Sequence, residues 1–321
     1  LIIFAVFMIL PALYAYGRDM QETRYLFILF PILCVISAYG LNLTKKLLNE
    51  KYLLAILTVI ILSSFLLLDY SQPDYVFHLA AEYGRWNGEA FYENLWQTNN
   101  VGTKHILRFQ EKLGFRHIFF SSAEVYGDFD GFMTEDVMVN NKISDTYQMN
   151  DYAISKWAGE QQCLNSSAMF DSEIVRVRPL NCYGPHEHYT PYRGFIPKFI
   201  YHALNNKPYT VFKGHKRIID FVEDSCKTFA NIVDNFIPGE VYNVGGKVEW
   251  EMDIKQYSDL VLKATGKDDS LVEYKEAEAF TTKIKTVDFS KAIRDLNHNP
   301  VVDPEEGIRR TTEWMRYFYR L

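Results

Sequence analysis

The chain has 321 residues, of which 48% are hydrophobic and 23% charged, with a formal net charge of −6. The acidic balance argues against a nucleic-acid partner, because no basic stripe is present that could neutralise phosphates. Four scattered cysteines without CxxC spacing indicate neither a zinc site nor a disulfide framework. Small molecules are therefore the expected ligands.

Charge is distributed unevenly along the chain. Of the 34 basic and 40 acidic residues, only nine lie in the first 70, where apolar runs cover residues 1–16, 25–43 and 52–68. Runs of roughly 17 to 20 apolar residues are long enough to cross a bilayer as helices. The sequence therefore predicts about three transmembrane helices in residues 1–70 and a multi-pass membrane location for the chain.

Residues 17–41 contain an Arg-Tyr-Leu-x-x-x-x-Pro run that begins at Arg24. This stretch resembles the late membrane helices of polyprenyl-phosphate-dependent glycosyltransferases. The catalytic acidic loop of those enzymes has no counterpart here, so the resemblance implies no activity.

From residue 73 onward, short apolar runs alternate with longer amphipathic stretches. Strands are expected near 75–80, 117–121 and 173–177, and helices near 94–113 and 152–164. Short buried strands alternating with helices are typical of a doubly wound parallel sheet. We therefore expect a Rossmann-like α/β domain over residues 73–321.

The strongest chemical signal is the pair Tyr152 and Lys156, which are four residues apart and so share one helix face. An ammonium near a phenol favours the phenolate, which lowers the pKa of the tyrosine toward the range of a general base. The spacing alone more often marks a solvated helix face. Its context favours a catalytic site.

Polar residues follow the predicted strands at the positions where parallel sheets bind ligands. Ser121, Ser122 and Glu124 follow the strand at 117–121, and the run from His78 to Ala81 ends the strand at 75–80. The strand at 173–177 leads into Arg178-Pro179-Leu180-Asn181. These segments are expected to meet at one edge of the sheet.

With these motifs in order, residues 73–321 resemble the extended short-chain dehydrogenase/reductase family, in particular its nucleotide-sugar epimerases and dehydratases. The resemblance implies that Tyr152 removes a proton from a sugar hydroxyl, usually at C4, while hydride leaves that carbon for NAD. It implies that Lys156 holds the nicotinamide ribose and that Ser122 hydrogen-bonds the reacting hydroxyl.

The same resemblance assigns further binding residues. Asn181 and Arg217 would contact the nucleotide-sugar substrate, although Asn181 could instead cap a turn and Arg217 could form a surface ion pair. A smaller substrate-binding part would include residues 182–215 and 247–321, and a helix bundle that includes residues 152–164 would form a homodimer. Asn100 is matched to the asparagine of the family's NxxGT run, with one residue fewer before Gly102 and Thr103. Residues expected along NAD, besides Tyr152 and Lys156, are His78, Ala80, Ala81, Asn100, Ser121 and Pro179.

The reaction itself stays open between epimerase, dehydratase and decarboxylase. In dehydratases and decarboxylases of the family, the glutamate that corresponds to Glu124 can remove the C5 proton once C4 is a ketone. The aspartate that expels the C6 hydroxyl in the dTDP-glucose type is replaced by Ala123. The histidines His186, His188 and His215 lie in polar loops without ligand spacing, so they are expected to be solvated and no metal site is predicted.

One part of the family pattern is missing. No GxxGxxG turn, which would place backbone N–H groups against the dinucleotide pyrophosphate, occurs in the sequence. The sheet is therefore expected to be truncated at its N-terminal side. Two alternatives to an active enzyme follow: a membrane-anchored, non-catalytic remnant, or a chimera of a sugar-nucleotide enzyme with a glycosyltransferase fragment.

Overall fold

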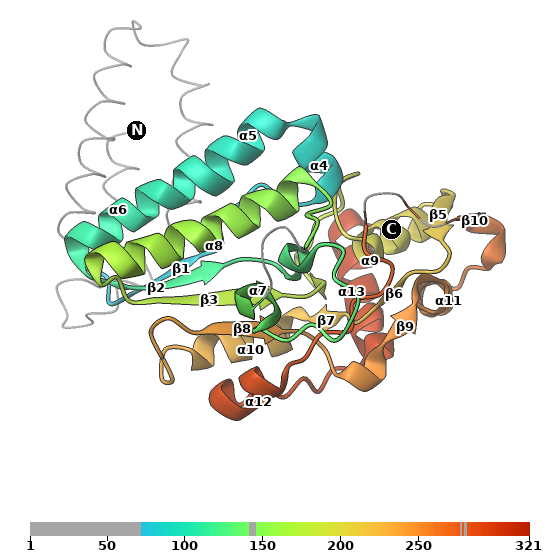
Figure 1. Cartoon of the computed structure of the whole chain (residues 1–321). Coiled ribbons are helices and arrows are strands. Elements are labelled where there is room, and N and C mark those ends of the chain that lie inside the picture. Colours follow the sequence, from blue (N-terminus) through green and yellow to red (C-terminus); the bar gives the residue numbers. More distant parts are fainter. Residues whose placement is uncertain (1–71, 141–145, 277, 279–280) are drawn as a thin grey trace, which may run out of the picture. The chain divides into compact units, whose positions relative to one another are not determined.

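A parallel sheet forms the core of the unit Tyr75–Leu321 in this computed structural model, which describes residues 72–140, 146–276, 278 and 281–321 (Figure 1). Its four strands have the order β1–β2–β3–β8, and each neighbouring pair is parallel. This confirms the α/β class with a Rossmann-like parallel sheet. The strands are β1 (Tyr75–His78), β2 (Arg116–Phe120), β3 (Ile174–Pro179) and β8 (Val241–Val244).

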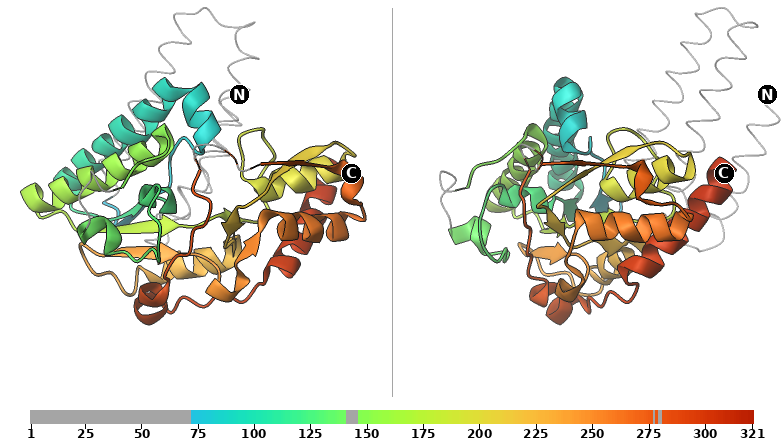
Figure 2. Two further views of the ribbon diagram at one scale, coloured as in Figure 1. Left: turned by 45° about the vertical axis from the view of Figure 1, so that its right-hand side comes forward. Right: turned by 90° about the vertical axis from the view of Figure 1, so that its right-hand side faces the viewer.

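Helices cover both faces of the sheet, as Figures 1 and 2 show: α6 (Thr103–Leu113) and α8 (Asp151–Phe170) on one face, α10 (Val222–Asn231) and α12 (Ser290–Leu296) on the other. Successive side chains of a strand point to opposite faces. Phe119 of β2 accordingly packs with the α6 and α8 residues, whereas its neighbours Ile118 and Phe120 pack in the cluster that includes α12. The strands are thus buried on both sides.

The helical path before β2 begins earlier than the expected 94–113. It contains α4 (Arg85–Ala90), α5 (Tyr92–Trp96), the π-helix Gln97–Gly102 and then α6. Helix α8 extends beyond the expected 152–164. Its N-terminus is capped by the Asn150 side chain, and it ends where Asp171 takes a left-handed conformation with φ 53°.

A second group of elements forms the C-terminal part, built from α9 (Phe195–Leu204), α11 (Ile254–Thr265), α13 (Pro304–Tyr319) and the parallel pair β5 (Tyr209–Phe212) and β10 (Val272–Lys275). These elements share one buried apolar cluster. The smaller elements are α7 (Val137–Asn140), β4 (Cys182–Tyr183), β6 (Lys216–Arg217), β7 (Asp220–Phe221), β9 (Met252–Asp253) and the 3-10 turns Ala123–Tyr126, Val248–Trp250 and Asp269–Leu271.

The predicted membrane location requires correction. Across the part of the chain that the structure describes, no helix has both the length and the apolar character needed to cross a bilayer. The three predicted spans at 1–16, 25–43 and 52–68 lie outside the described residues. The multi-pass assignment is therefore withdrawn.

Candidate active site

The predicted catalytic residues meet at the carboxyl edge of the sheet. Strand β2 ends at Phe120 and leads into Ser122, while α8 begins at Asp151 and so places Tyr152 in its first turn. The Lys156 ammonium donates a hydrogen bond to the Phe120 carbonyl at 2.8 Å, which ties the helix to the end of the strand. Tyr152 and Lys156 are 7% and 5% exposed.

The electrostatics of this pair differ from the expectation. Burial raises the pKa of Tyr152, and the Glu124 carboxylate adds to this, while a hydrogen bond with Ser122 acts in the opposite direction. The Lys156 nitrogen lies 5.9 Å from the centroid of the Tyr152 ring, and burial lowers the pKa of Lys156 to about 8. The prediction that Lys156 lowers the pKa of Tyr152 is therefore not met in this structure.

Ser121 is engaged in a buried network. Its hydroxyl donates to the Glu160 carboxylate at 2.5 Å, and the Arg178 guanidinium donates to both Glu160 oxygens at 2.9 and 2.8 Å. Glu160 is fully buried and Arg178 is 1% exposed. This network connects α8 with the ends of β2 and β3. Ser121 therefore lies where a cofactor residue was expected, but its hydroxyl already has a protein partner.

Glu124 forms an ion pair that no motif predicted. Its carboxylate accepts a hydrogen bond from the ammonium of Lys285, whose side chain is only 2% exposed. Lys285 and Arg217 lower the pKa of Glu124 against the opposing effect of burial. The candidate base for C5 chemistry is thus held as a carboxylate by a buried cation.

Arg217 and Asn181 both have protein partners. The Arg217 guanidinium donates to the carbonyls of Lys216, Thr282 and Lys283 and to the Thr281 hydroxyl. Asn181 has a left-handed backbone with φ 44°, and its amide donates to the Ile218 carbonyl at 3.1 Å. The alternative of a surface ion pair for Arg217 does not fit the structure, since this residue is 8% exposed.

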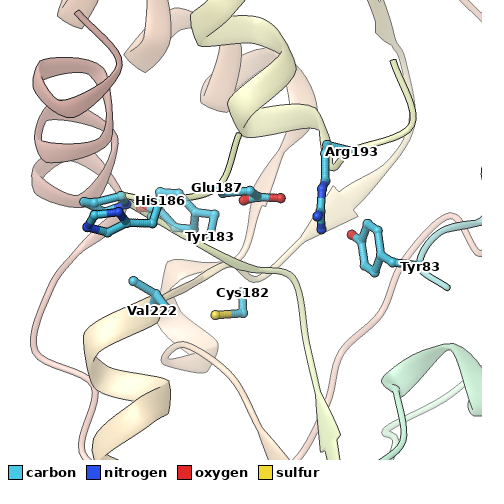
Figure 3. Close-up of a pocket in the computed structure, with 9 residues that line it drawn as sticks. Tyr83, Cys182, Tyr183, His186, Glu187, Arg193 and Val222 are labelled. Atoms are coloured by element: carbon cyan, nitrogen blue, oxygen red, sulfur yellow. The ribbon is translucent and has the colours of Figure 1, made fainter. Parts of the chain in front are cut away.

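A cavity of about 340 Å³ is lined by residues that include Tyr83, Glu187 and Arg193 (Figure 3). The Tyr83 ring lines it and meets the Tyr152 ring edge-on at 5.9 Å between centroids. The Arg193 guanidinium lies 5.4 Å from the centre of the Tyr83 ring, and burial raises the pKa of Glu187 to about 7. Tyr83, Glu187 and Arg193 were missed, because no motif or spacing marks them.

The residues expected along the cofactor lie at the ends of β1 and β3. His78 is the last residue of β1 and is buried, Ala80 and Ala81 follow it, and Pro179 ends β3. Asn100 is 8% exposed, and neither polar atom of its side chain has a hydrogen-bond partner within the described residues. Unpaired buried amide atoms are costly, so this pair of atoms fits a polar cofactor group.

The neighbouring asparagine was overlooked in the sequence. Asn99, and not Asn100, has the full NxxGT spacing to Gly102 and Thr103. Its side chain accepts a hydrogen bond from the Glu82 N–H at 2.8 Å and donates to the Glu82 carbonyl and to the Ser155 hydroxyl. Asn99 therefore fastens the loop after β1 to helix α8.

The loop histidines differ among themselves. His186 and His188 are exposed and pack against the Trp314 ring. His215 is 3% exposed and accepts a hydrogen bond from the Glu278 N–H at 2.9 Å. The prediction that all three are solvated is wrong for His215, because its side chain is buried.

A parallel sheet that presents a tyrosine and a lysine from one helix at its carboxyl edge defines a short-chain-dehydrogenase type of enzyme. The model of the NAD dependent epimerase/dehydratase family matches residues 53–245. This match begins inside the apolar run at 52–68. The chain belongs to the NAD dependent epimerase/dehydratase family.

Individual relatives agree with this assignment. The chain is 29% identical over 254 residues to a UDP-N-acetyl-alpha-D-glucosaminuronate decarboxylase of Bacillus cytotoxicus, covering 77% of this chain and 78% of that protein. It is 30% identical over 269 residues to a dTDP-glucose 4,6-dehydratase of Neisseria meningitidis serogroup B, covering 76% and 72%.

Solved structures show the same fold with cofactor bound. A UDP-glucuronic acid 4-epimerase from Bacillus cereus, in complex with UDP-glucuronic acid and NAD, matches with a TM-score of 0.69 and 25% identity over 77% of this chain and 76% of that one. A dTDP-glucose 4,6-dehydratase from Streptomyces venezuelae with NAD bound matches with a TM-score of 0.68 and 25% identity over 78% and 76%. The family, the enzyme class and NAD as cofactor are confirmed. Neither the non-catalytic remnant nor the chimera with a glycosyltransferase fragment is better supported than an NAD-dependent epimerase/dehydratase.

Proposed function

We propose that this chain, an NAD-dependent nucleotide-sugar epimerase/dehydratase, oxidises the C4 hydroxyl of its sugar with Tyr152 as the base. The observation that carries the proposal is the placement of Tyr152 and Lys156 on one face of α8, beside Ser122, at the carboxyl edge of the sheet. The relatives named above act on UDP- and dTDP-linked sugars, which supports the substrate class.

Each residue has a distinct task in this scheme. Ser122 holds the reacting hydroxyl, and Tyr152 takes its proton as general base. Lys156, Asn100 and the end of β1 at His78 would hold the cofactor, with Ala80, Ala81 and Pro179 lining it. When bound there, NAD supplies the hydride acceptor and a positive charge close to the phenol. Lys156, fixed on the Phe120 carbonyl, keeps a second cation near Tyr152.

The Glu124 carboxylate extends the scheme beyond C4. A 4-epimerase needs hydride transfer and rotation of the keto-sugar, whereas dehydration and other C5 chemistry need a second base. Glu124 is paired with the Lys285 ammonium and lies two residues after Ser122, which caps the same 3-10 turn. We therefore propose that this site can act on the carbon next to the C4 ketone.

The test uses the full chain with NAD and two probes, dTDP-glucose and UDP-glucuronate. Tyr152→Phe should reduce turnover by roughly 10² to 10⁴-fold, the usual contribution of a general base, while NAD binding followed by thermal stabilisation stays the same. Tyr317→Phe, at a ring that is 85% exposed, is the matched control. Turnover of Tyr152→Phe at the wild-type rate would rule out its role as base.

We also propose a homodimer through the outer faces of α6 and α8. Phe109 on α6 and Leu164 on α8 are large apolar residues that are 42% and 40% exposed. Leu164→Glu should convert the dimer into a monomer in analytical ultracentrifugation. A wild-type chain that sediments as a monomer would contradict this proposal without affecting the catalytic one.

A further inference from the structure

Lys285 is a buried lysine that lies outside every motif of the sequence, and its ammonium contacts the Glu124 carboxylate. The two residues are 161 positions apart, so only the folded chain brings them together. Lys285 lies in the described stretch 281–289 that precedes α12. A buried ammonium without a counter-charge would be strongly disfavoured, so the pair forms as a unit.

The backbone fixes Lys285 independently of Glu124. Met133 donates its N–H to the Thr286 carbonyl at 2.9 Å, and Asp288 donates its N–H to the Met133 carbonyl at 3.0 Å. A β-bridge between Met133 and Val287 completes this contact. The Thr286 hydroxyl also donates to Glu251 at 3.0 Å. Lys285 is therefore followed directly by residues that are hydrogen-bonded to Met133 and Glu251.

We propose that Lys285 is a positioning residue that keeps Glu124 ionised and directed as the base for the sugar carbon next to the C4 ketone. This inference rests on the proposed function and deepens it. Because 4-epimerisation alone does not require Glu124, the buried pair of Glu124 and Lys285 favours C5 proton chemistry at this site.

The charges around Glu124 favour the carboxylate. Burial alone would raise its pKa, but Lys285, Arg217 and Arg85 together lower it. The charged and titratable groups that face Glu124 are Lys285 from the segment before α12, Arg217 from β6, Arg85 from α4, Tyr152 from α8 and Tyr83 from the loop after β1. Lys285 makes a direct hydrogen bond to the Glu124 carboxylate.

The chemical step is a proton transfer. The Glu124 carboxylate takes the C5 proton, the electron pair of the broken C–H bond forms a double bond between C4 and C5, and the π pair of the C4 ketone moves onto its oxygen, giving an enolate. Return of a proton from the protonated Glu124 to C5 restores the ketone. In deuterated water this cycle exchanges the C5 hydrogen for deuterium with no net change in oxidation state.

The first test needs no substrate. The full chain, labelled with ¹³C at the glutamate carboxyl carbon, is titrated by NMR, and the Glu124 signal is assigned as the one missing in Glu124→Gln. Lys285→Met should raise the titration midpoint of Glu124 by at least one pH unit, and Lys285→Arg should restore it. Lys263→Met, which removes the lysine of an exposed pair with Glu305, is the control. An unchanged midpoint in Lys285→Met would overturn the proposal.

The second test measures C5 exchange with NAD and the two probes dTDP-glucose and UDP-glucuronate. Lys285→Met should shift the pH midpoint of deuterium incorporation upward by at least one unit, which lowers the rate about tenfold at a pH below both midpoints, while NAD reduction persists. If Lys285→Met does not fold by circular dichroism, Lys285→Gln replaces it in both tests. Failure of wild-type NAD reduction would reject the proposed function, whereas the NMR titration alone still decides the role of Lys285.

Discussion

The buried ion pair between Glu160 and Arg178 should dominate the stability of the catalytic edge. Glu160→Gln removes the negative charge but keeps the shape of the side chain. The Arg178 guanidinium, which is only 1% exposed, then lacks its main counter-charge. Hydrogen bonds from Arg178 to both Glu160 oxygens and from Ser121 to one of them are weakened together. Removing one partner of a buried pair costs about 3 to 5 kcal/mol.

The assay is thermal unfolding of the full chain followed by circular dichroism. At roughly 2 to 4 °C per kcal/mol for a domain of this size, Glu160→Gln should lower the melting temperature by roughly 6 to 20 °C. Asp259→Asn, at an exposed pair with Lys255, should change stability by no more than about 0.5 kcal/mol. The double variant Glu160→Met/Arg178→Met should recover part of the loss, because the buried Arg178 charge is removed together with its partner. Arg176, which also pairs with Glu160 at 3.5 Å, keeps its charge in both variants. A single variant that melts within 2 °C of wild type, on the order of a surface change, would refute the reasoning.

Two other perturbations test the surroundings of the site. Gly127 has φ +55°, and an added Cβ would lie 2.2 Å from the Tyr147 carbonyl oxygen. Gly114 has φ +74°, but an added Cβ there would meet no atom within 4 Å. Gly127→Ala should therefore lower the urea midpoint of unfolding far more than Gly114→Ala does. Burial lowers the pKa of His78 to about 4. Below about pH 6.5 the unfolded chain therefore binds a proton that the folded chain binds only near pH 4. The free energy of unfolding should thus be lower at pH 5 than at neutral pH by about 2 kcal/mol. His78→Gln should make the urea midpoints at pH 7.5 and pH 5 more similar; an equal drop in both proteins would contradict this assignment.

The elements that alternate most clearly along the chain were the ones that could be predicted. The three strands near 75–80, 117–121 and 173–177 appear as β1, β2 and β3, because each is a short apolar run bounded by turn residues. The chemical set of Ser122, Tyr152 and Lys156 could also be placed together, since parallel strand ends meet at one edge. Periodicity and strand order are local properties, so they can be inferred from the sequence.

Long-range charge pairing could not be predicted in the same way. Lys285 reaches Glu124 only because the segment before α12 pairs with Met133. Arg217 is held by carbonyls from residues 282 and 283 in the same segment. No spacing in the sequence encodes either contact, because both depend on where the C-terminal part lies against the sheet. The same limit explains why His215 was expected to be solvated although it is buried.

The two adjacent asparagines of the π-helix allow the cofactor assignment to be separated from structural effects. Asn99→Ala removes three hydrogen bonds, to the Glu82 N–H, the Glu82 carbonyl and Ser155, and should cost about 1 to 3 kcal/mol of stability. Asn100→Ala removes two atoms without partners within the described residues, so it should leave the melting temperature of the chain nearly unchanged. With NAD added, however, wild type and Asn99→Ala should be stabilised to a similar extent and Asn100→Ala much less. If Asn100→Ala gains as much from NAD as wild type, Asn100 does not contact the cofactor and its buried amide remains an unexplained cost of the fold.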